Sequence, residues 1–382
     1  MDATAPNLHL TTIDGLRNCL IATGQSNDDE IVLLSGGNAN YVYRVTGTDS
    51  STRIYKHAAP YSRSSKDFAL DVRRMDYEAF ILNFLSTVPP TSHTSGQTTI
   101  TVQTPSLVSY DQPQKLLCIT DGGTRNLKAA YDDPKLDIPA VGHALAHWLA
   151  DLHHTSKPTS LTPSTPSSQT NTVDTPTTPH QQTHNNNPIA LHLYRHSYDN
   201  LHLALQDFSH DPQLGKTINT QFGTLLATDN ECICHGDFWP GNILLHTGPA
   251  PHAAATKLEL SIVDWELVRR GTSATDVGQF AAEAWLHDRF RGGRGLLRAF
   301  LEAYAGRRGG VGAGWVRRMV VHWAVHVAFW PTRVEWADLE GTRVVVGMGV
   351  EVLKAVLEGD WERIFGTGLL GGVGDVLRGM VV

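Results

Sequence analysis

The sequence predicts a two-lobed α+β fold, in which a small antiparallel sheet with one helix is followed by a larger, mainly helical lobe. Its 382 residues are enough for two cores rather than one. Short segments with strand patterns crowd together before residue 121, whereas apolar residues recur at helical spacing after residue 138. This order places a sheet-rich lobe first and a helical lobe second.

The composition is that of a globular protein and excludes several function classes. Apolar residues make up 41%, the formal net charge is -7, and basic residues occur only as isolated pairs, which argues against a nucleic-acid partner. The first ten residues lack the basic start and apolar core of a secretory signal, and no run of about twenty apolar residues predicts a membrane span. Because the four cysteines are too sparse for a disulfide framework, we expect a cytoplasmic protein.

The first lobe is expected over residues 25–121, after an N-terminal helix within residues 1–24. The amphipathic residues 11–24 end at a glycine, as a short helix does. Within the lobe the patterns predict strands at 31–34, 41–45 and 52–57, a helix at 71–85, and two more strands at 102–111 and 115–121. The Ser- and Thr-rich residues 91–101 are expected to form a loop.

The second lobe is expected over residues 122–382. A strongly amphipathic helix is predicted at 138–154. Residues 155–188 consist almost entirely of Ser, Thr, Pro, Gln, Asn and His, and therefore cannot bury enough apolar surface to order themselves. We expect them to be a disordered insert that acts as a flexible spacer. Helical patterns resume at Ile189, a strand is predicted at 257–266, and most of the remaining sequence is helical.

The segment ICHGDFWPGNILL, residues 233–245, places a His, an Asp and an Asn in one short loop between apolar runs. Phosphoryl transfer from ATP needs a carboxylate that orients the attacking hydroxyl and accepts its proton, and oxygen ligands for Mg²⁺. Asp237 is the predicted catalytic base and Asn242 a predicted metal ligand. The Pro-Gly pair between them favours a turn that returns Asn242 toward Asp237. We expect His235 to anchor the loop backbone rather than to transfer protons.

A second acidic element, SIVDWE, follows about twenty residues later. It is predicted to be an apolar strand that ends in Asp264 and Glu266, which share one face because residues two apart on a strand do. Both carboxylates could then face one metal ion, with Trp265 directed away. Asp264 is the predicted second metal ligand. Glu266 is expected either to assist in binding the metal or to contact the metal ligands without binding the metal itself.

The first lobe supplies candidate residues for the nucleotide. Lys56 lies on the third predicted strand, and Glu78 lies in the predicted helix, where it could pair with Lys56 and hold it in place. The turn SGGNAN could lay backbone N–H groups over the phosphates. Its candidate contacts are Gly36, Gly37, Asn38 and Asn40. Backbone groups at the end of the last strand could read the adenine edge, and these belong to Ile119, Thr120 and Asp121.

Together these segments resemble the aminoglycoside phosphotransferase superfamily, a group of protein-kinase-like folds that includes choline, homoserine and methylthioribose kinases. The resemblance is carried by GGNANYVYRV, Lys56, Glu78, CHGDFWPGNILL and SIVDWE, and it spans roughly residues 30 to 350 without the insert. It implies a protein-kinase-like α+β fold, Asp237 as the base, and Asn242 and Asp264 as Mg²⁺ ligands. It also implies that Asp276 has a structural role, buttressing the catalytic loop.

Within the superfamily, GGNANYVYRV and IYKHAAPY are most similar to methylthioribose kinases. Those kinases carry an arginine pair for their substrate in the late helical region. In this chain only Arg343 stands at a comparable place, which makes it a candidate substrate contact.

The expected function is ATP- and Mg²⁺-dependent phosphorylation of a hydroxyl group on a small molecule, such as a sugar, an amino alcohol or an aminoglycoside. Two rival functions keep the same fold. One is a catalytically inactive pseudokinase that binds a nucleotide or a partner. The other is an atypical protein kinase, which the absence of D-F-G and A-P-E motifs disfavours.

Each candidate residue also has a purely structural interpretation. Asp237 and Asn242 could serve only the local hydrogen bonds of a turn. Lys56 could be a solvated strand residue, Glu78 an exposed helix carboxylate, and Arg343 half of a surface ion pair. Cys232 and Cys234 form a lone C-x-C, for which buried strand thiols are favoured over a metal site. The tryptophans of the helical part are assigned to the core rather than to a substrate pocket: Trp285, Trp323 and Trp330.

Overall fold

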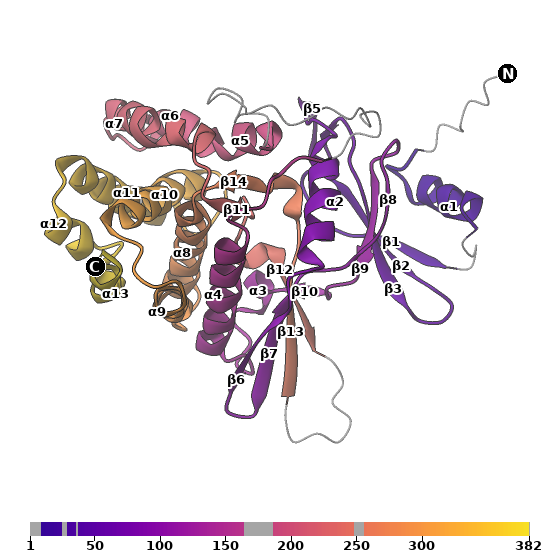
Figure 1. Cartoon of the computed structure of the whole chain (residues 1–382). Helices are drawn as coiled ribbons and strands as arrows, with labels where there is room; N and C mark the ends of the chain where they lie inside the picture. The colour runs from indigo at the N-terminus through magenta and orange to yellow at the C-terminus, as the bar shows by residue number, and fades with distance from the viewer. Residues whose placement is uncertain (1–8, 25–28, 36, 164–185, 248–255, 382) are drawn as a thin grey trace, which may run out of the picture. The chain divides into compact units, whose positions relative to one another are not determined.

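The computed structural model describes residues 9–24, 29–35, 37–163, 186–247 and 256–381 (Figure 1). The chain divides into two compact units. The first comprises Met1–Thr87 and Thr104–Gly122, and the second comprises Val88–Gln103 and Gly123–Val382. Each unit is described by itself.

The first unit is built on an antiparallel sheet with the strand order β1-β2-β3-β9-β8. In β2, buried and half-buried side chains alternate, and Tyr43 and Val45 join a core that includes Leu16 and Leu20 of helix α1. Helix α2 packs against β8 and β9. The elements of this unit are α1 (Ile13–Ala22), β1 (Glu30–Leu33), β2 (Tyr41–Thr46), β3 (Thr52–His57), β4 (Tyr61–Ser62), β5 (Ser65–Ala69), α2 (Arg74–Leu85), β8 (Leu107–Asp111) and β9 (Leu116–Thr120).

The second unit contains its own sheet, with the order β10-β12-β13-β7-β6. Its strands are β6 (Thr91–Ser95), β7 (Thr98–Gln103), β10 (Arg125–Asn126), β12 (Ile243–Thr247) and β13 (Thr256–Ile262). The prediction of a loop over residues 91–101 is therefore wrong. Ile100 and Val102 are fully buried and alternate with polar residues. The Ser and Thr residues form the polar face of a strand, and in the sequence this pattern resembles a Ser/Thr-rich loop. Strand β7 pairs in parallel with β13, while the other pairs in this sheet are antiparallel.

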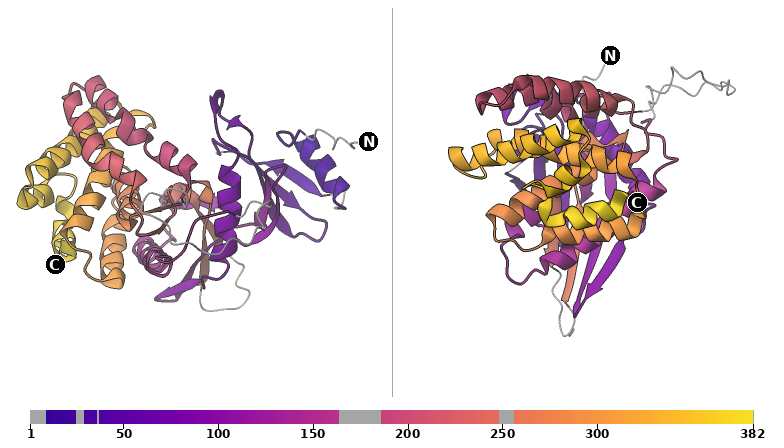
Figure 2. Two further views of the ribbon diagram at one scale, coloured as in Figure 1. Left: turned by 45° about the horizontal axis from the view of Figure 1, so that its top comes forward. Right: turned by 90° about the vertical axis from the view of Figure 1, so that its left-hand side faces the viewer.

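Helices dominate the rest of the second unit. Helix α8 packs against α9 and α10, the orange helices of Figure 2, and every residue from Ser273 to His287 is buried. The main helices are α3 (Leu127–Ala130), α4 (Ile138–Thr155), α5 (Pro188–Tyr194), α6 (His196–Asp207), α7 (Pro212–Ile218), α8 (Ser273–Phe290), α9 (Leu296–Arg308), α10 (Ala313–Phe329), α11 (Leu339–Glu358), α12 (Trp361–Gly366) and α13 (Gly374–Val381). Two short strands and six single turns complete the unit: β11 (Cys232–Cys234), β14 (Arg269–Gly271), η2 (Asn219–Gly223), η3 (Thr224–Ala227), η4 (Pro240–Asn242), η5 (Trp265–Leu267), η6 (Trp330–Thr332) and η7 (Gly371–Val373).

Both ends of the predicted insert 155–188 are ordered, whereas its residues 164–185 lie outside the described residues. Arg270 donates hydrogen bonds to the backbone oxygens of Lys157 and Thr159. Asn187 is fully buried and caps helix α5 by accepting from the N–H groups of its first turn. The prediction of disorder is thus wrong at the two ends, because Arg270 satisfies backbone oxygens at the first end and the buried Asn187 caps a helix at the second.

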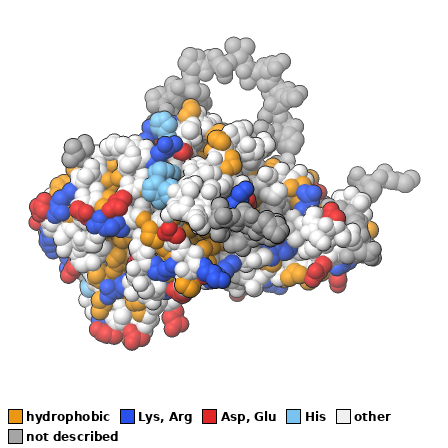
Figure 3. All heavy atoms as spheres, turned by 90° about the horizontal axis from the view of Figure 1, so that it is seen from below, with side chains coloured by type: hydrophobic (Ala, Val, Ile, Leu, Met, Phe, Trp, Pro, Cys, Tyr) orange, Lys and Arg blue, Asp and Glu red, His pale blue; other side chains and the backbone are white. Residues whose placement is uncertain are grey.

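The α+β fold class predicted from the sequence is confirmed, with antiparallel strands concentrated in the first part and helices in the second. Charged side chains of both signs are interspersed over the face of the molecule shown in Figure 3. Among the described residues, none of the helices combines the length and the apolar character that crossing a membrane requires.

Candidate active site

The H-G-D-x-x-x-x-N loop joins two strands that hold it at both ends. Strand β11 before the loop pairs with β14, and β12 after it pairs with β10 and β13. Gly236 has φ +85°, and a Cβ atom there would lie 2.0 Å from the backbone oxygen of Leu267. Only glycine fits both the left-handed conformation and the close approach of the two backbones.

Gly236 therefore gives a stability prediction. We expect Gly236→Ala to destabilise the protein by about 2 kcal/mol or more, because the backbone at Leu267 has to move or the chain has to leave its native φ. Urea unfolding followed by circular dichroism measures the change. Gly306→Ala is the matched control, since a Cβ atom there meets open space in helix α9. Equal losses in the two variants would contradict the prediction.

Asp276 clamps the start of the loop. The N–H groups of His235 and Gly236 donate to its two carboxylate oxygens over 2.7 and 3.1 Å. Asp276 is fully buried in the first turn of α8. Burial opposes its ionisation, but the hydrogen bond from His153 and the charges of His153 and Arg269 outweigh burial and lower the pKa of Asp276 to about 2. Asp276 therefore remains a carboxylate and fixes the loop backbone.

His235 has a single tautomer that follows from its partners. Its Nδ1 accepts from the backbone N–H of Asp237 at 3.1 Å, so this nitrogen carries no proton. The other nitrogen, Nε2, then carries the proton and donates to the backbone oxygen of Val263 at 3.0 Å. His235 thus links the backbone of Asp237 to the residue before Asp264, as expected of an anchor.

The carboxylate of Asp237 is held by two amide side chains. Asn242 Nδ2 donates to Asp237 Oδ2 at 2.9 Å and to its backbone oxygen at 3.0 Å. Gln279 Nε2, from helix α8, donates to Asp237 Oδ1 at 2.7 Å. Because the Asn242 amide nitrogen is engaged in this way, its oxygen Oδ1 is the atom that could bind a metal ion.

The pKa of Asp237 is raised to about 7. Burial is the largest cause, the negative charge of Asp264 is the next, and Glu283 adds a smaller contribution. The hydrogen bonds from Gln279 and Asn242 act in the opposite direction. A carboxyl group of this pKa is suited to accept a proton near neutral pH.

This raised pKa gives a prediction for the metal-free protein. The fold binds the Asp237 proton more tightly than the unfolded chain does, whose carboxyl pKa is the ordinary 3.8. The free energy of unfolding therefore falls as pH rises from about 4 to 7 and stays low above that. We expect Asp237→Asn to raise the melting temperature in EDTA at pH 8 and to change it much less at pH 4. Parallel pH profiles for the variant and the wild type would contradict this.

Asp264 does not lie on a strand as predicted. Strand β13 ends at Ile262, Asp264 has the left-handed φ of 69°, and Trp265–Leu267 is a single 3-10 turn. The argument that Asp264 and Glu266 share one strand face is therefore wrong, because the chain turns at Asp264 itself. A non-glycine residue in this conformation is held there by its surroundings, which is common at functional sites.

The two predicted metal ligands nevertheless emerge at the same end of neighbouring strands. Ile243 and Ile262 are cross-strand partners, and the Val263 N–H donates to the backbone oxygen of Asn242 at 3.0 Å. Asn242 precedes the first strand and Asp264 follows the second. An amide oxygen beside carboxylates is the donor set that Mg²⁺ prefers, so these residues fit a magnesium ion.

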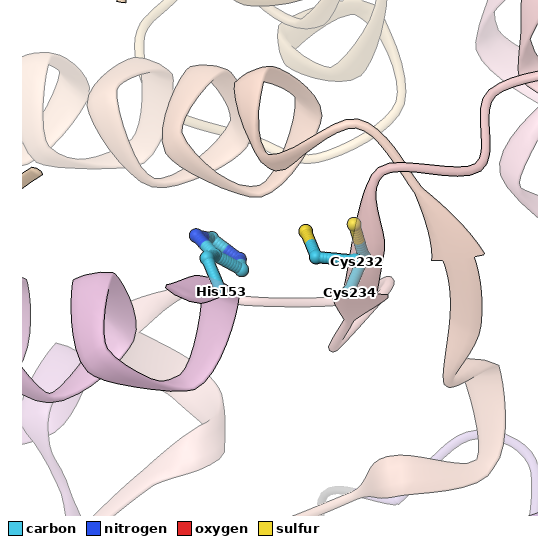
Figure 4. A group of neighbouring side chains, drawn as sticks. All are labelled: His153, Cys232 and Cys234. Carbon is cyan, nitrogen blue, oxygen red and sulfur yellow. The ribbon is translucent and has the colours of Figure 1, made fainter. Parts of the chain in front are cut away.

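Figure 4 shows His153 of helix α4 close to Cys232 and Cys234 of strand β11, and the possible ligand atoms of the three residues lie within 4.8 Å of one another. Both ring nitrogens of His153 are already engaged. Nε2 donates to Asp276 at 3.2 Å, and Nδ1 lies 2.9 Å from the hydroxyl group of Tyr304. Since the imidazole has no nitrogen left for a metal ion, this group supports Asp276 and the cysteines are buried strand thiols.

The first unit holds the predicted lysine–glutamate pair. Lys56 Nζ on β3 lies 2.8 Å from Glu78 Oε2 on α2, and both side chains are buried. Burial of both partners makes this pair a fixed element rather than a surface contact.

The predicted phosphate loop is only partly described, because Gly36 lies outside the described residues, while Gly37 is exposed. Asn40 is buried, and its side-chain oxygen accepts from Arg74 at 2.8 Å. The backbone oxygen of Asn38 accepts from the Ser62 hydroxyl at 2.7 Å. The Asn40 side chain therefore shapes the turn.

Three residues were predicted to contact the adenine edge. Ile119 and Thr120 are the last residues of strand β9, and Asp121 follows the strand directly. The backbone of Ile119 is paired within the sheet, and the Thr120 N–H donates to Ser106 at 3.0 Å. Asp121 binds Arg44 in a bidentate ion pair, at 2.6 and 3.0 Å. The Asp121 side chain is thus a partner of Arg44.

Two further candidate residues, Arg343 and Glu266, make contacts with other residues of the protein that fit a structural role. Arg343 is exposed on α11 and lies 3.4 Å from Glu340, which is the surface ion pair considered as its alternative. Glu266 is buried, and its backbone oxygen accepts from Asn187. Of the tryptophans assigned to the core, Trp323 is fully buried and Trp285 nearly so, while Trp330 is half-buried.

Three polar residues that were not predicted from the sequence lie in helices beside the loop: Gln279, Glu283 and His326. Gln279 binds Asp237, and Glu283 Oε1 lies 2.8 Å from Nε2 of His326. Within the described part of the chain the second oxygen of Glu283 is buried and has no hydrogen-bond partner. The signal was present, since Asp276, Gln279 and Glu283 follow one another at three- and four-residue spacing on one helix face.

This chain is similar to known proteins in its sequence and in its fold. Residues 30–318 match the family model described as the phosphotransferase enzyme family, which is more than half of the chain. The chain is 27% identical to a 4-hydroxytryptamine kinase of Psilocybe cyanescens, over 85% of this chain and 87% of that protein. It is 24% identical to the enzyme of the same name from Psilocybe cubensis, over 83% and 84%. A Plasmodium vivax ethanolamine kinase is a similar solved structure, with TM-score 0.48, 10% identity and 90% of each chain covered.

The match to the family model runs from strand β1 into helix α10 and includes the H-G-D-x-x-x-x-N loop. The 4-hydroxytryptamine kinases match along nearly their full length as well. The chain therefore belongs to the phosphotransferase enzyme family and is a small-molecule kinase.

Proposed function

We propose that this kinase uses ATP and Mg²⁺ to phosphorylate a hydroxyl group of its acceptor, with Asp237 as the catalytic base. The observation that carries the proposal is the Asp237 carboxylate, which Asn242 and Gln279 fix in place and whose pKa is raised to about 7 by burial and by Asp264. Such a group is deprotonated in part at neutral pH and is basic enough to assist a hydroxyl group.

In this mechanism one carboxylate oxygen of Asp237 accepts the proton of the acceptor hydroxyl, and the hydroxyl oxygen bonds to the γ-phosphorus while the bond from that phosphorus to the β,γ-bridging oxygen breaks and ADP leaves. Gln279 and Asn242 keep the carboxylate oriented during the transfer. Asn242 Oδ1 and Asp264 would hold Mg²⁺, which neutralises phosphate charge when it is bound. Lys56, fixed by Glu78, would steady the nucleotide phosphates.

The acceptor is proposed to carry a positively charged amine. Glu283 is 93% buried yet has one oxygen without a partner among the described residues, and it lies one helical turn beyond Gln279. A buried carboxylate oxygen is costly unless a charged donor pairs with it. The name of the 4-hydroxytryptamine kinases describes an acceptor with a hydroxyl group and an amine, which agrees with this charge.

A product assay tests the proposal. The purified chain is incubated with Mg²⁺-ATP and either 4-hydroxytryptamine, its N-acetyl derivative or a metabolite extract, and mass spectrometry detects phosphorylated products. We expect phosphorylation of hydroxylated amines by the wild type. Nucleotide binding without any phosphorylated product would favour a pseudokinase, and phosphate on a generic protein substrate instead would favour an atypical protein kinase.

Glu283→Gln tests the charge of the acceptor separately. Losing one charged hydrogen bond costs about 1.5–3 kcal/mol, so kcat/KM for an amine acceptor should fall roughly 10- to 100-fold. The N-acetyl derivative, which has no charge at that position, should be affected much less. Equal losses for both acceptors would show that Glu283 does not recognise the amine.

A further inference from the structure

Three histidines of the second unit meet away from the catalytic loop. His93 belongs to strand β6, and His143 and His147 belong to helix α4, which packs against that strand. The two helical histidines are four positions apart in the sequence, so they are neighbours on one helix face. The group is called the histidine trio below.

The rings of the trio are in direct contact. The ring centroids of His93 and His143 are 4.1 Å apart, those of His143 and His147 are also 4.1 Å apart, and those of His93 and His147 are 6.4 Å apart. Nδ1 of His143 is buried and has no hydrogen-bond partner within the described residues. A buried nitrogen of this kind is unfavourable unless something binds to it.

The trio borders a cavity of about 500 Å³ that also contains two carboxylates. Asp137, the N-cap of α4, accepts from the Ser95 hydroxyl at 3.0 Å, which places its carboxylate beside the same strand as His93. Glu302 of α9 also lines the cavity, and its carboxylate pairs with Arg298 at 2.6 Å. Imidazoles beside carboxylates in a partly open space form a donor set for a cation.

Burial lowers the pKa of both helical histidines, and neighbouring histidine rings lower it further. An uncharged imidazole carries one nitrogen with a free lone pair. The metal-binding form of imidazole is this neutral form.

We propose that the histidine trio binds a divalent transition metal such as Zn²⁺, with the Asp137 carboxylate or water completing the coordination. Nitrogen ligands favour Zn²⁺, Ni²⁺ and Cu²⁺, whereas Mg²⁺ prefers the oxygen ligands around the catalytic loop, so the two sites select different ions. The three rings do not converge on one point, so metal binding requires each ring to rotate about the bond between Cβ and the ring. This rotation is inexpensive because the energy wells of that torsion are broad.

A metal ion at this site would tie the β6–β7 hairpin to helix α4. The same helix carries His153, which supports Asp276 behind the catalytic loop. The site would therefore stabilise the part of the second unit on which the loop rests, and it is independent of the acceptor proposed above.

The test is metal titration of the whole purified chain in the presence of saturating Mg²⁺. Binding of Co²⁺, used as a spectroscopic probe for Zn²⁺, is followed by its visible absorption, and Zn²⁺ binding by calorimetry and thermal unfolding. We expect one nitrogen-ligated site, and the double substitution His143→Gln/His147→Gln should weaken binding by about tenfold or more. His154→Gln, an exposed residue of the same helix, is the control and should bind like the wild type.

Two results would overturn the proposal. One is a wild-type dissociation constant for Zn²⁺ weaker than about 100 μM. The other is unchanged binding in the double variant, which would assign the metal to other histidines of the chain. The phosphotransfer rate and metal-free melting temperature of the double variant show whether it is folded, and His93→Gln provides a second variant on a different element.

Discussion

Asp237→Asn is expected to lower kcat by about 10²- to 10⁴-fold while the protein still binds Mg²⁺-ATP. The substitution keeps the shape of the side chain and removes the group that accepts the acceptor proton. The amides of Asn242 and Gln279 donate to different oxygens of this carboxylate, so the variant keeps an acceptor for only one of them. Steady-state kinetics give kcat, and calorimetry with a non-hydrolysable ATP analogue gives nucleotide affinity.

The matched control is Asp207→Asn, an exposed carboxylate at the end of α6. It should leave kcat unchanged. Turnover by Asp237→Asn at the wild-type rate would show that Asp237 is not the base. A loss of nucleotide affinity equal to the loss of rate would instead indicate a role in binding.

Asp276→Asn is expected to reduce both stability and activity. Asp276 is fully buried with His153 and Arg269 around it, and removing one partner of a buried charge cluster costs about 3–5 kcal/mol. The backbone N–H groups of His235 and Gly236 lose one of their acceptors, because the amide offers a single oxygen. The loop that carries Asp237 then loses its fixed position, and kcat should fall.

Urea unfolding and kcat are both measured for this variant. The exposed pair of Arg298 and Asp375 supplies the comparison, since Asp375→Asn should cost less than about 1 kcal/mol and leave kcat unchanged. An Asp276→Asn protein of wild-type stability would show that this carboxylate does not hold the loop.

The sequence was informative where chemistry restricts the residue type. Asp237, Asn242 and the Lys56–Glu78 pair could be predicted as site residues because each role accepts few side chains and the order along the chain is restrictive, whereas Asp276 was predicted from the family resemblance. The structure adds what a linear pattern does not contain. It gives the hydrogen bonds from Asn242 and Gln279 that orient the Asp237 carboxylate.

Other features could not be assigned from pattern alone. Asp264 and Glu266 fit a strand by spacing, yet the chain leaves the strand at Ile262, because φ at one residue is not encoded by alternation. Residues 91–101 lack the apolar density of most strands, and their strand character arises from pairing with distant residues. Spacing places Glu283 on the same helix face as Asp276 and Gln279, but only the structure shows that one of its oxygens is buried without a partner among the described residues.

The parallel pairing of β7 with β13 has a consequence for biosynthesis. Thr98 of β7 faces Thr256 of β13, so the earlier strand leaves the ribosome long before its neighbour exists. At a translation rate of about 5–20 residues per second, the hairpin waits roughly 8 to 30 seconds with one edge unsatisfied. During that time the Ser and Thr side chains of β6 and β7 keep the exposed surface of the hairpin polar, which limits aggregation of the nascent chain. The same side chains are the reason that the hairpin was not predicted from the sequence.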